Sequence, residues 1–282
     1  EIYGGVAGFY DYGSYGTLLK RKLENTWRKY FLGLDENFFE IETTNIMPEK
    51  VFEASGHLTN FVDPAAKCKK CGTFHRADQI MEEFLHESFE GKTAQELTKL
   101  IKKHNVRCPR CKGELGDVSV LNMMFPIELG ASKETRGYLR PETAQGAYVN
   151  FLRHFNILRM KLPLGLAIIG KAFRNEITTK DFLYRTREFT QMEMEYFVDP
   201  VEAEKAYSYW KEFMLDWFVN QLGLPKNSFR YRPIPKEEMS HYAKIQNDFE
   251  FRSSSGKWFE LSPLNHRGDY DLSGHQKYSG KI

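Results

Sequence analysis

The stretch REFTQMEMEYF, residues 187–197, alternates polar and apolar side chains with the period of a β-strand. Successive side chains of a strand point to opposite faces, so one face would carry Arg187, Phe189, Gln191, Glu193 and Glu195, and the other Thr190, Met192, Met194 and Tyr196. The second set predicts contact with the core, and the first set predicts contact with a cavity or with water. The chain is therefore expected to contain a sheet with one buried face.

A preceding strand is expected over AFRNEI, residues 172–177, and would place Arg174 and Glu176 on one face. The connection TTKDFLYR, residues 178–185, is longer than the hairpin turn of about two to five residues, and long ordered loops are often functional. Arginine binds phosphate oxygens in a fork, and Phe189 offers a flat surface to a base. The two strands thus predict a nucleotide site with Glu176 near an adenine amino group. A salt-bridged sheet without a ligand is the alternative.

Neither G-x-x-x-x-G-K-[ST] nor G-x-G-x-x-G occurs, so side chains of the sheet would have to hold the nucleotide. The remaining acids Glu142 and Glu193 would suit a small cation such as an amino group. Glu142 stands just before a helix that Thr143 is expected to cap, so pairing with the helix dipole is its alternative role. That helix would bury Tyr148, Phe151, Leu152, Phe155 and Leu158.

Four cysteines form two C-x2-C pairs, Cys68 with Cys71 and Cys108 with Cys111. Each pair can present two sulfurs to one side of a tetrahedral zinc ion, and a helix expected over residues 93–105 accounts for the long segment between the pairs. With four sulfur ligands the ion would have no open position, so its role would be structural. Two disulfides or four unpaired thiols are the alternatives.

Another helix is expected over residues 15–33, with an apolar face that comprises Leu19, Leu23, Trp27, Tyr30 and Phe31. Its basic residues could contact RNA or form a solvated face; they are Lys20, Arg21, Lys22, Arg28 and Lys29. The 40 basic and 38 acidic residues of the whole chain nearly balance, so charge alone predicts no partner. No apolar run reaches the length of a membrane span and the first residues do not read as a secretion signal, which predicts a cytoplasmic protein without a membrane partner.

Several motifs together resemble one family, the homodimeric class II glycyl-tRNA synthetases in their bacterial-like form. The motifs occur in the family's order and cover nearly the whole chain: EIYGGVAGFYDYGSYG, VFEASGHLTNFVDP, YLRPETAQGAYVNF, IGKAFRNEI, TREFTQMEMEYFVDP and HRGDYDLSGH. FRNEI with REFTQMEMEYF resembles the second class II signature, and PETAQG resembles the glycyl subgroup. The paired C-x2-C motifs, with HRADQ after the first, are similar to the same form.

The resemblance implies an α+β fold, with an antiparallel sheet flanked by helices and an inserted zinc module. It implies an N-terminal part of the catalytic domain with a dimer-type helix at residues 1–62, the zinc insertion at 63–120 and the remainder of the catalytic domain at 121–282. The third class II signature and the anticodon-binding domain are not found in these residues. The implied activity is ATP-dependent activation of glycine and its transfer to tRNA(Gly), with Mg²⁺ as cofactor, structural zinc and a homodimer as the assembly.

The resemblance also implies roles for single residues. Arg174, Glu176 and Arg187 would be catalytic. The ATP site would comprise Arg174, Asn175, Glu176, Tyr184, Arg185, Thr186, Arg187, Glu188, Phe189, Glu260 and Leu261, with the last two also on the magnesium side. The glycine site would comprise Arg76, Glu142, Phe189, Thr190, Gln191, Glu193 and Arg267.

The chain departs from the family pattern near Arg267, where Pro263 replaces a glycine and Asn265 replaces an alanine. A non-catalytic protein that binds RNA or a partner is therefore an alternative function. A class II enzyme that adenylates another small acid or amine is a third, and it would not need Glu142 together with Glu193.

Overall fold

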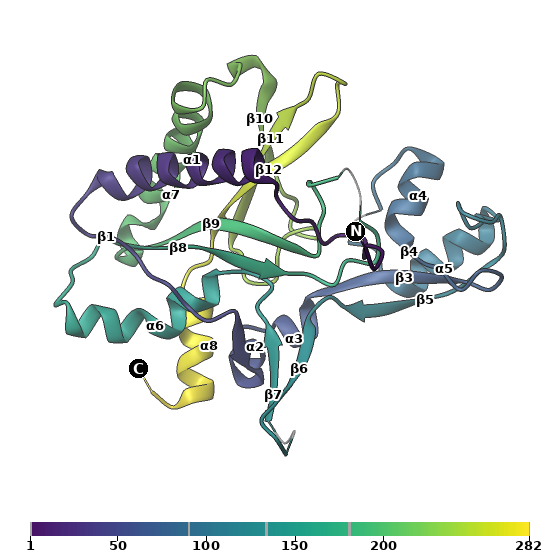
Figure 1. Ribbon diagram of the computed structural model, residues 1–282, viewed down its shortest axis with the longest axis horizontal. Helices are drawn as coiled ribbons and strands as arrows, with labels where there is room; N and C mark the ends of the chain where they lie inside the picture. Colours follow the sequence, from purple (N-terminus) through teal and green to yellow (C-terminus); the bar gives the residue numbers. More distant parts are fainter. Residues whose placement is uncertain (1, 90, 133–134, 180–181, 282) are drawn as a thin grey trace. The chain divides into compact units, whose positions relative to one another are not determined.

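The computed structural model describes residues 2–89, 91–132, 135–179 and 182–281 (Figure 1). The chain divides into two compact units, each built from three segments. The first unit comprises Glu1–Gly13, Thr44–Glu142 and Lys171–Gln191, and the second comprises Ser14–Thr43, Thr143–Gly170 and Met192–Ile282. None of the helices in the described ranges is both long and apolar enough to span a bilayer.

The first unit contains two three-stranded antiparallel sheets. One sheet has the order β2 (Ile46–Pro48), β7 (Thr135–Leu139), β6 (Phe125–Leu129), and the other has the order β4 (Phe74–Arg76), β3 (Val62–Cys68), β5 (Leu115–Asn122). The helices of this unit are α2 (Glu49–Ala54), α3 (His57–Asn60), α4 (Ala77–Leu85) and α5 (Ala94–Lys103). Figure 1 shows α4 and α5 beside β3 and β5, and their apolar side chains share one core with those strands.

Helix α5 shows how local sequence fixes an element of this core. The Thr93 hydroxyl accepts a hydrogen bond from the Glu96 N–H, and the Glu96 carboxylate accepts one from the Thr93 N–H, which is a capping box. Leu97 and Ile101, one turn apart, are buried in the core. The helix predicted between the two cysteine pairs is thus confirmed.

The second unit contains most of a sheet with the order β1 (Phe38–Glu40), β8 (Leu164–Phe173), β9 (Glu188–Phe197), in which β1 is parallel to β8. Residues 171–173 of β8 and 188–191 of β9 are assigned to the first unit. Its other sheet is the antiparallel order β10 (Phe229–Pro233), β11 (Ile245–Arg252), β12 (Trp258–His266). The helices are α1 (Ser14–Phe31), α6 (Ala144–Ile157), α7 (Ala203–Asp216) and α8 (Tyr270–Ser279), and short helical turns lie at Leu32–Leu34, Pro200–Glu202, Trp217–Gln221 and Lys226–Ser228. An aromatic core of this unit includes Trp27, Phe31, Trp210, Trp217 and Phe249.

The two faces of β9 follow the predicted alternation. Met192, Met194 and Tyr196 pack against the aromatic core, which confirms the apolar face. The strand predicted over residues 172–177 is wrong beyond its start, because β8 ends at Phe173 and residues 174–177 have no regular secondary structure. In the predicted connection, Lys180 and Asp181 lie outside the described residues.

Two predicted apolar faces are only half right. In α1, Trp27 and Phe31 are buried, but Leu19 is 71% exposed and Leu23 is 39% exposed, because only the second half of the helix packs on the aromatic core. Glu24 is buried there instead, and its carboxylate pairs with Lys20 at 2.6 Å. In α6, Phe151 and Phe155 pack against an apolar core that includes Leu164 and Leu166. Leu152 and Leu158 are exposed, so the prediction that they are buried is wrong.

Candidate active site

Arg174 lies just after β8 and is held by three groups of the first unit. Its Nε donates to the Pro141 carbonyl at 3.0 Å. Its guanidinium carbon is 5.4 Å from the centre of the Phe61 ring and 5.3 Å from the centre of the Phe189 ring. Within the described part of the chain, Nη1 and Nη2 of Arg174 have no hydrogen-bond partner. The side chain is therefore fixed, and two of its donor groups remain for a ligand.

Arg187 uses its guanidinium differently. Nη1 donates to the Ala7 carbonyl at 2.6 Å, and Nε and Nη2 donate to the Glu176 carbonyl at 3.2 and 2.8 Å. The backbone N–H of Arg187 also donates to the Gly8 carbonyl at 2.7 Å. Gly8 has a φ of +87°, and a Cβ there would lie 2.7 Å from Thr179 Cγ2, so this approach requires glycine. Arg187 thus ties the N-terminal segment to residues 174–176, a positioning role that the sequence did not predict.

Arg76 lies in a buried ion-pair cluster with Asp63 and Asp78. Its Nη1 is 3.3 Å from Asp63 Oδ1, its Nε donates to Asp78 Oδ1 at 3.1 Å, and its Nη2 pairs with Asp78 Oδ2. Burial raises the pKa of Asp63 to about 6, partly opposed by Arg76 and helped by the charge of Glu176.

Three buried polar atoms belong to this cluster or to the charged residues that act on Asp63. Among the residues that the structure describes, no partner is found for Oδ2 of Asp63, Oε2 of Glu176 or Nη1 of Arg185. A buried carboxylate oxygen without a donor is costly, so these atoms suit a ligand that supplies donor and acceptor groups.

The raised pKa of Asp63 predicts how the stability of the fold changes with pH. Because the pKa is higher in the folded than in the unfolded state, ionisation of Asp63 destabilises the fold as pH rises from about 4 to about 6. Asp63→Asn cannot ionise, so its free energy of unfolding relative to wild type is expected to rise over this range by about 1 to 3 kcal/mol. Urea unfolding of both proteins across that pH range measures the difference.

Asp117→Asn is the matched control, because Asp117 is an exposed aspartate of the same unit whose pKa is lowered by the hydrogen bond from Lys102. The difference in free energy of unfolding between Asp117→Asn and wild type should stay constant above about pH 5. If the difference in free energy of unfolding between Asp63→Asn and wild type does not change from about pH 4 to about pH 6, the raised pKa of Asp63 is contradicted.

Glu142 ends the first unit's middle segment and is 6% exposed. Its Oε1 lies 3.4 Å from His57 Nε2, and His57 Nδ1 is 2.8 Å from the Ser55 hydroxyl. Glu142 thus contacts a buried histidine of its own unit. His57 was missed from the sequence, because a lone histidine in GHL carries no spacing signal.

In the second unit, the carboxylate of Glu193 accepts hydrogen bonds from the N–H of Thr143, at 3.2 Å, and from its hydroxyl. Thr143 is the N-cap residue of α6, as predicted, but its side chain makes no cap hydrogen bond to the helix. The threonine that begins the helix instead positions a carboxylate of β9.

Arg267 pairs with Asp271, at 2.7 Å from Nε and 2.8 Å from Nη2. Its guanidinium carbon also lies 3.6 Å from the Tyr242 ring centre and 5.2 Å from that of Tyr148. The Tyr148 hydroxyl donates to Glu195, and burial raises the pKa of Glu195 to about 8, with Arg267 opposing and Glu193 adding to the rise. The alternation along the strand predicted that Glu195 lies on the polar face, but the sequence did not reveal Tyr148 or Asp271 as its neighbours.

The other predicted residues occupy varied surroundings. Glu260 and Leu261 are exposed on β12 at a bulge, where Leu261 has no partner in the register with β11. Pro263 is tolerated because β12 is the edge strand of its three-stranded sheet. The N–H of Asn175 donates to the Met123 carbonyl at 2.7 Å, and the Thr186 hydroxyl donates to the Glu188 carbonyl at 2.9 Å. The Glu188 carboxylate pairs with Lys171 at 2.6 Å. Tyr184 is exposed, and Thr190 and Gln191 are half-buried on β9.

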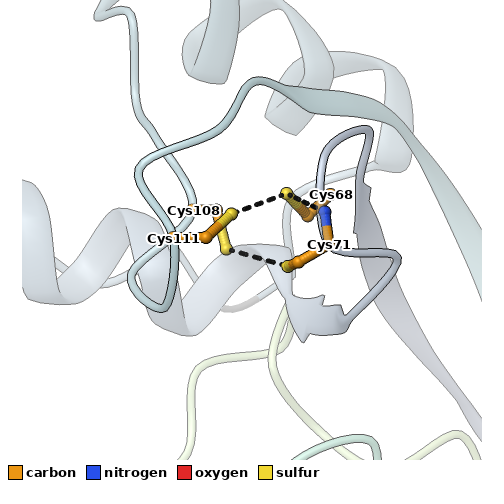
Figure 2. Close-up of side chains that lie close together, drawn as sticks. All are labelled: Cys68, Cys71, Cys108 and Cys111. Atoms are coloured by element: carbon orange, nitrogen blue, oxygen red, sulfur yellow. Dashed lines mark hydrogen bonds between the residues drawn. The ribbon is translucent and has the colours of Figure 1, made fainter.

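The four cysteines come together at one end of the β4-β3-β5 sheet, and Figure 2 shows their sulfurs turned toward a common centre. Cys68 and Cys111 sulfurs are 3.5 Å apart, those of Cys71 and Cys108 are 3.8 Å apart, and all four lie within 4.8 Å of one another. No disulfide joins them. Zn–S bonds of about 2.3 Å in a tetrahedron place sulfurs about 3.8 Å apart, so the spacing fits zinc.

The two C-x2-C turns have the same backbone geometry. The N–H of Cys68 donates to Thr73 O at 2.9 Å, and that of Cys108 donates to Gly113 O at the same distance. Gly72 and Lys112, the residues that follow each second cysteine, both have positive φ, at 72° and 59°. This repeated geometry is compatible with four thiolates around one ion.

A comparison with protein-family models matches residues 125–273 to the tRNA synthetase class II core domain (G, H, P, S and T). The match spans more than half of the chain, which therefore belongs to the class II aminoacyl-tRNA synthetase family. Its similar relatives in that family are glycine–tRNA ligases. It is 43% identical to the one of Pyrococcus abyssi, over 99% of this chain and 56% of that protein. It is 40% identical to the one of Caldanaerobacter subterraneus subsp. tengcongensis, over 100% of this chain and 62% of that protein.

Solved structures agree on the fold. Giardia lamblia prolyl-tRNA synthetase in complex with prolyl-adenylate matches with a TM-score of 0.62 at 14% identity, over 95% of this chain and 42% of that chain. The RNA binding domain of threonyl-tRNA synthetase from Cryptosporidium parvum matches with a TM-score of 0.57 at 16% identity, over 95% of this chain and 58% of that chain. The predicted resemblance and the class II α+β fold with antiparallel sheets are confirmed.

Proposed function

We propose that the protein activates glycine with ATP and transfers it to tRNA(Gly). The observation that carries the proposal is Arg174, which is fixed by Pro141, Phe61 and Phe189 while two of its nitrogens stay available for an anion. In this reaction the glycine carboxylate attacks the α-phosphorus of ATP, pyrophosphate leaves, and the resulting adenylate esterifies a ribose hydroxyl of the tRNA. Alignment and charge neutralisation suffice, so no protein nucleophile is required.

The nucleotide would be held mainly by the first unit. Arg174 would bind the α-phosphate, and the unpartnered Oε2 of Glu176 would accept a hydrogen bond from the adenine amino group. Phe189 would supply ring surface to the base, and Arg187 would hold the loop that carries Glu176. Mg²⁺, when bound, neutralises phosphate charge, and Glu260 is the residue that the family resemblance assigns to its side of the site.

Glycine would be recognised through its amino group by Glu142 and Glu193. The supporting observations are that Glu142 is buried beside His57, with its Oε1 3.4 Å from the His57 Nε2, and that Thr143 fixes Glu193. Arg76 and Arg267, both already paired with aspartates, would contribute positive charge near the substrate. A small closed pocket excludes larger amino acids by steric clash, which reduces the need for editing.

Replacing either acid by glutamine tests the amino-group pocket. Glu142→Gln and Glu193→Gln each remove one charge from the site and are expected to weaken glycine binding by about 1.5 to 3 kcal/mol, with ATP binding little changed. Glycine titration in pyrophosphate exchange gives the apparent affinity. Glu204→Gln, an acid of the first turn of α7, is the control. If both site variants keep the wild-type glycine affinity, the pocket is misplaced.

We further infer that Cys68, Cys71, Cys108 and Cys111 bind one structural zinc ion in an insertion at residues 63–120, between catalytic parts at 1–62 and 121–282. The supporting observations are the sulfur spacing and a separate apolar core formed by residues 66–118.

A homodimer is inferred from the family and is supported by the exposed Leu18 and Leu19 on α1. Light scattering at several protein concentrations measures the assembly.

Glycine-dependent pyrophosphate exchange by the full-length native protein tests the function. Exchange that requires glycine, and is not supported by alanine or serine, is the expected result. Absence of exchange would favour the second candidate, a synthetase-like protein that binds RNA or a partner without catalysis. The basic residues of α1 lend that alternative less support, because Lys20 and Arg21 pair with Glu24, and Arg28 pairs with Glu40.

A further inference from the structure

Phe61 belongs to none of the ATP or glycine contacts proposed above, yet its ring lies against Arg174. It follows α3 directly, and its N–H donates to the His57 carbonyl at 3.1 Å. Its carbonyl accepts a hydrogen bond from the Met123 N–H at 3.1 Å, and the Met123 carbonyl accepts one from the Asn175 N–H at 2.7 Å. Backbone hydrogen bonds therefore fix Phe61 beside the segment that carries Arg174.

The contact between Phe61 and Arg174 has the geometry of a cation–π interaction. The guanidinium carbon is 5.4 Å from the ring centre, inside the limit of about 6 Å, and Phe189 adds a second ring at 5.3 Å. With Nε bound to the Pro141 carbonyl, the two rings restrict rotation of the guanidinium plane. We name these three groups, Phe61, Phe189 and the Pro141 carbonyl, the arginine cradle.

We propose that Phe61 is a positioning residue that holds the Arg174 guanidinium, through its ring face, with Nη1 and Nη2 directed at the α-phosphate of ATP. This inference rests on the proposed function, since it concerns the same step. A freely rotating arginine would have to be ordered each time the phosphate binds, and an arginine ordered in advance avoids that entropy loss. Phe61 is thus expected to act on the ATP step and not on glycine recognition.

A packing role is the competing explanation, because Phe61 also contacts the small core formed by Met47, Phe52, Met124 and Tyr138. Shape and ring electrons must therefore be varied separately. Phenylalanines with one, two and three fluorine atoms on the ring keep the shape nearly constant and weaken the negative face of the ring in steps. Phe61→Leu removes the ring and keeps apolar volume, and Phe61→Tyr keeps the ring.

The test measures kcat/KM for ATP in glycine-dependent pyrophosphate exchange by the full-length native protein. Phe61→Leu is expected to lower it by roughly 3- to 30-fold, and the fluorinated series should fall stepwise toward that value. Phe61→Tyr should stay within about 2-fold of wild type, and KM for glycine should stay constant in all variants. On an Arg174→Ala background, Phe61→Leu should have no further effect, because the residue acts through Arg174.

A flat fluorinated series overturns the inference, and so does an equal loss on the Arg174→Ala background. If the wild-type protein itself shows no glycine-dependent exchange, the proposed function fails, and the cradle is then tested by nuclear magnetic resonance. The Nε–H signal of Arg174, assigned with Arg174→Lys, should move in Phe61→Leu because it loses a nearby ring, while that of Arg28, bound to Glu40, should not. An unmoved Arg174 signal would show that the ring does not hold the guanidinium.

Discussion

Cys108→Ser is expected to abolish zinc binding and to unfold the apolar core around helix α5. Cys108 is fully buried, and its sulfur is 3.8 Å from that of Cys71 and within 4.8 Å of the other two, so serine at this position takes away one of the four thiolate ligands. Structural zinc in small modules contributes about 10 to 16 kcal/mol of apparent binding free energy, which becomes folding free energy. We therefore expect a loss of more than about 4 kcal/mol in the local stability of this core.

Two measurements check this result. Elemental analysis should give one zinc per wild-type chain and almost none for Cys108→Ser, and hydrogen exchange should show lost protection at Leu97 and Ile101, which are buried in the same core. The matched control is Lys112→Gly. Lys112 has a φ of 59° at the position that Gly72 occupies in the other turn, so glycine should keep the metal and relieve about 1 kcal/mol of backbone strain. A wild-type chain without zinc, or one with two disulfides, would contradict the prediction.

Arg174→Ala is expected to lower glycine-dependent pyrophosphate exchange by about 10²- to 10³-fold. An arginine that meets developing charge on a phosphate in a water-poor site contributes roughly 2.7 to 4 kcal/mol to the transition state. The fold should change little, because the only hydrogen bond of the side chain to the described residues is the one from Nε to Pro141. Pyrophosphate exchange and thermal unfolding of the same preparation separate the two effects.

Arg136→Ala is the control for losing an arginine that contacts an aromatic ring. Arg136 lies 5.4 Å from the centre of the Tyr138 ring and 3.9 Å from Glu49, and its side chain is exposed. Its loss should leave exchange unchanged. Exchange that survives in Arg174→Ala would remove the central observation behind the proposed function.

The fold class was predicted from the family resemblance, whereas the two faces of the strand at residues 187–197 and the cysteine cluster were predicted from local spacing. The period of two along residues 187–197 separated Met192 and Met194 from Glu193 and Glu195, and the same separation is seen on β9. The spacing of the cysteines predicted a four-sulfur cluster, and the Thr93–Glu96 pair marks the start of the helix between them. The roles of individual site residues remain predictions.

Other features depended on which surfaces meet, and no local pattern carries that information. Leu19 and Leu23 have the helical spacing of buried residues, but only the half of α1 that contains Trp27 and Phe31 has a core to pack against. Arg174 and Arg187 look equivalent in sequence. The Arg187 guanidinium donates hydrogen bonds to the carbonyls of Ala7 and Glu176, whereas that of Arg174 donates to the Pro141 carbonyl from Nε and has no further hydrogen bond to the described residues.

The sequence by itself determined the alternation along β9, the helix α5, the four thiols and the set of charged residues, because side-chain period, capping and spacing act over a few residues along the chain. Only the tertiary structure decided which charges are paired. The contacts of Asp63 with Arg76, of Phe61 with Arg174 and of Thr143 with Glu193 join residues that lie 13, 113 and 50 positions apart. Such contacts follow from the burial and hydrogen bonding of the whole fold, since a buried charge is stable only where the packed chain supplies its partner.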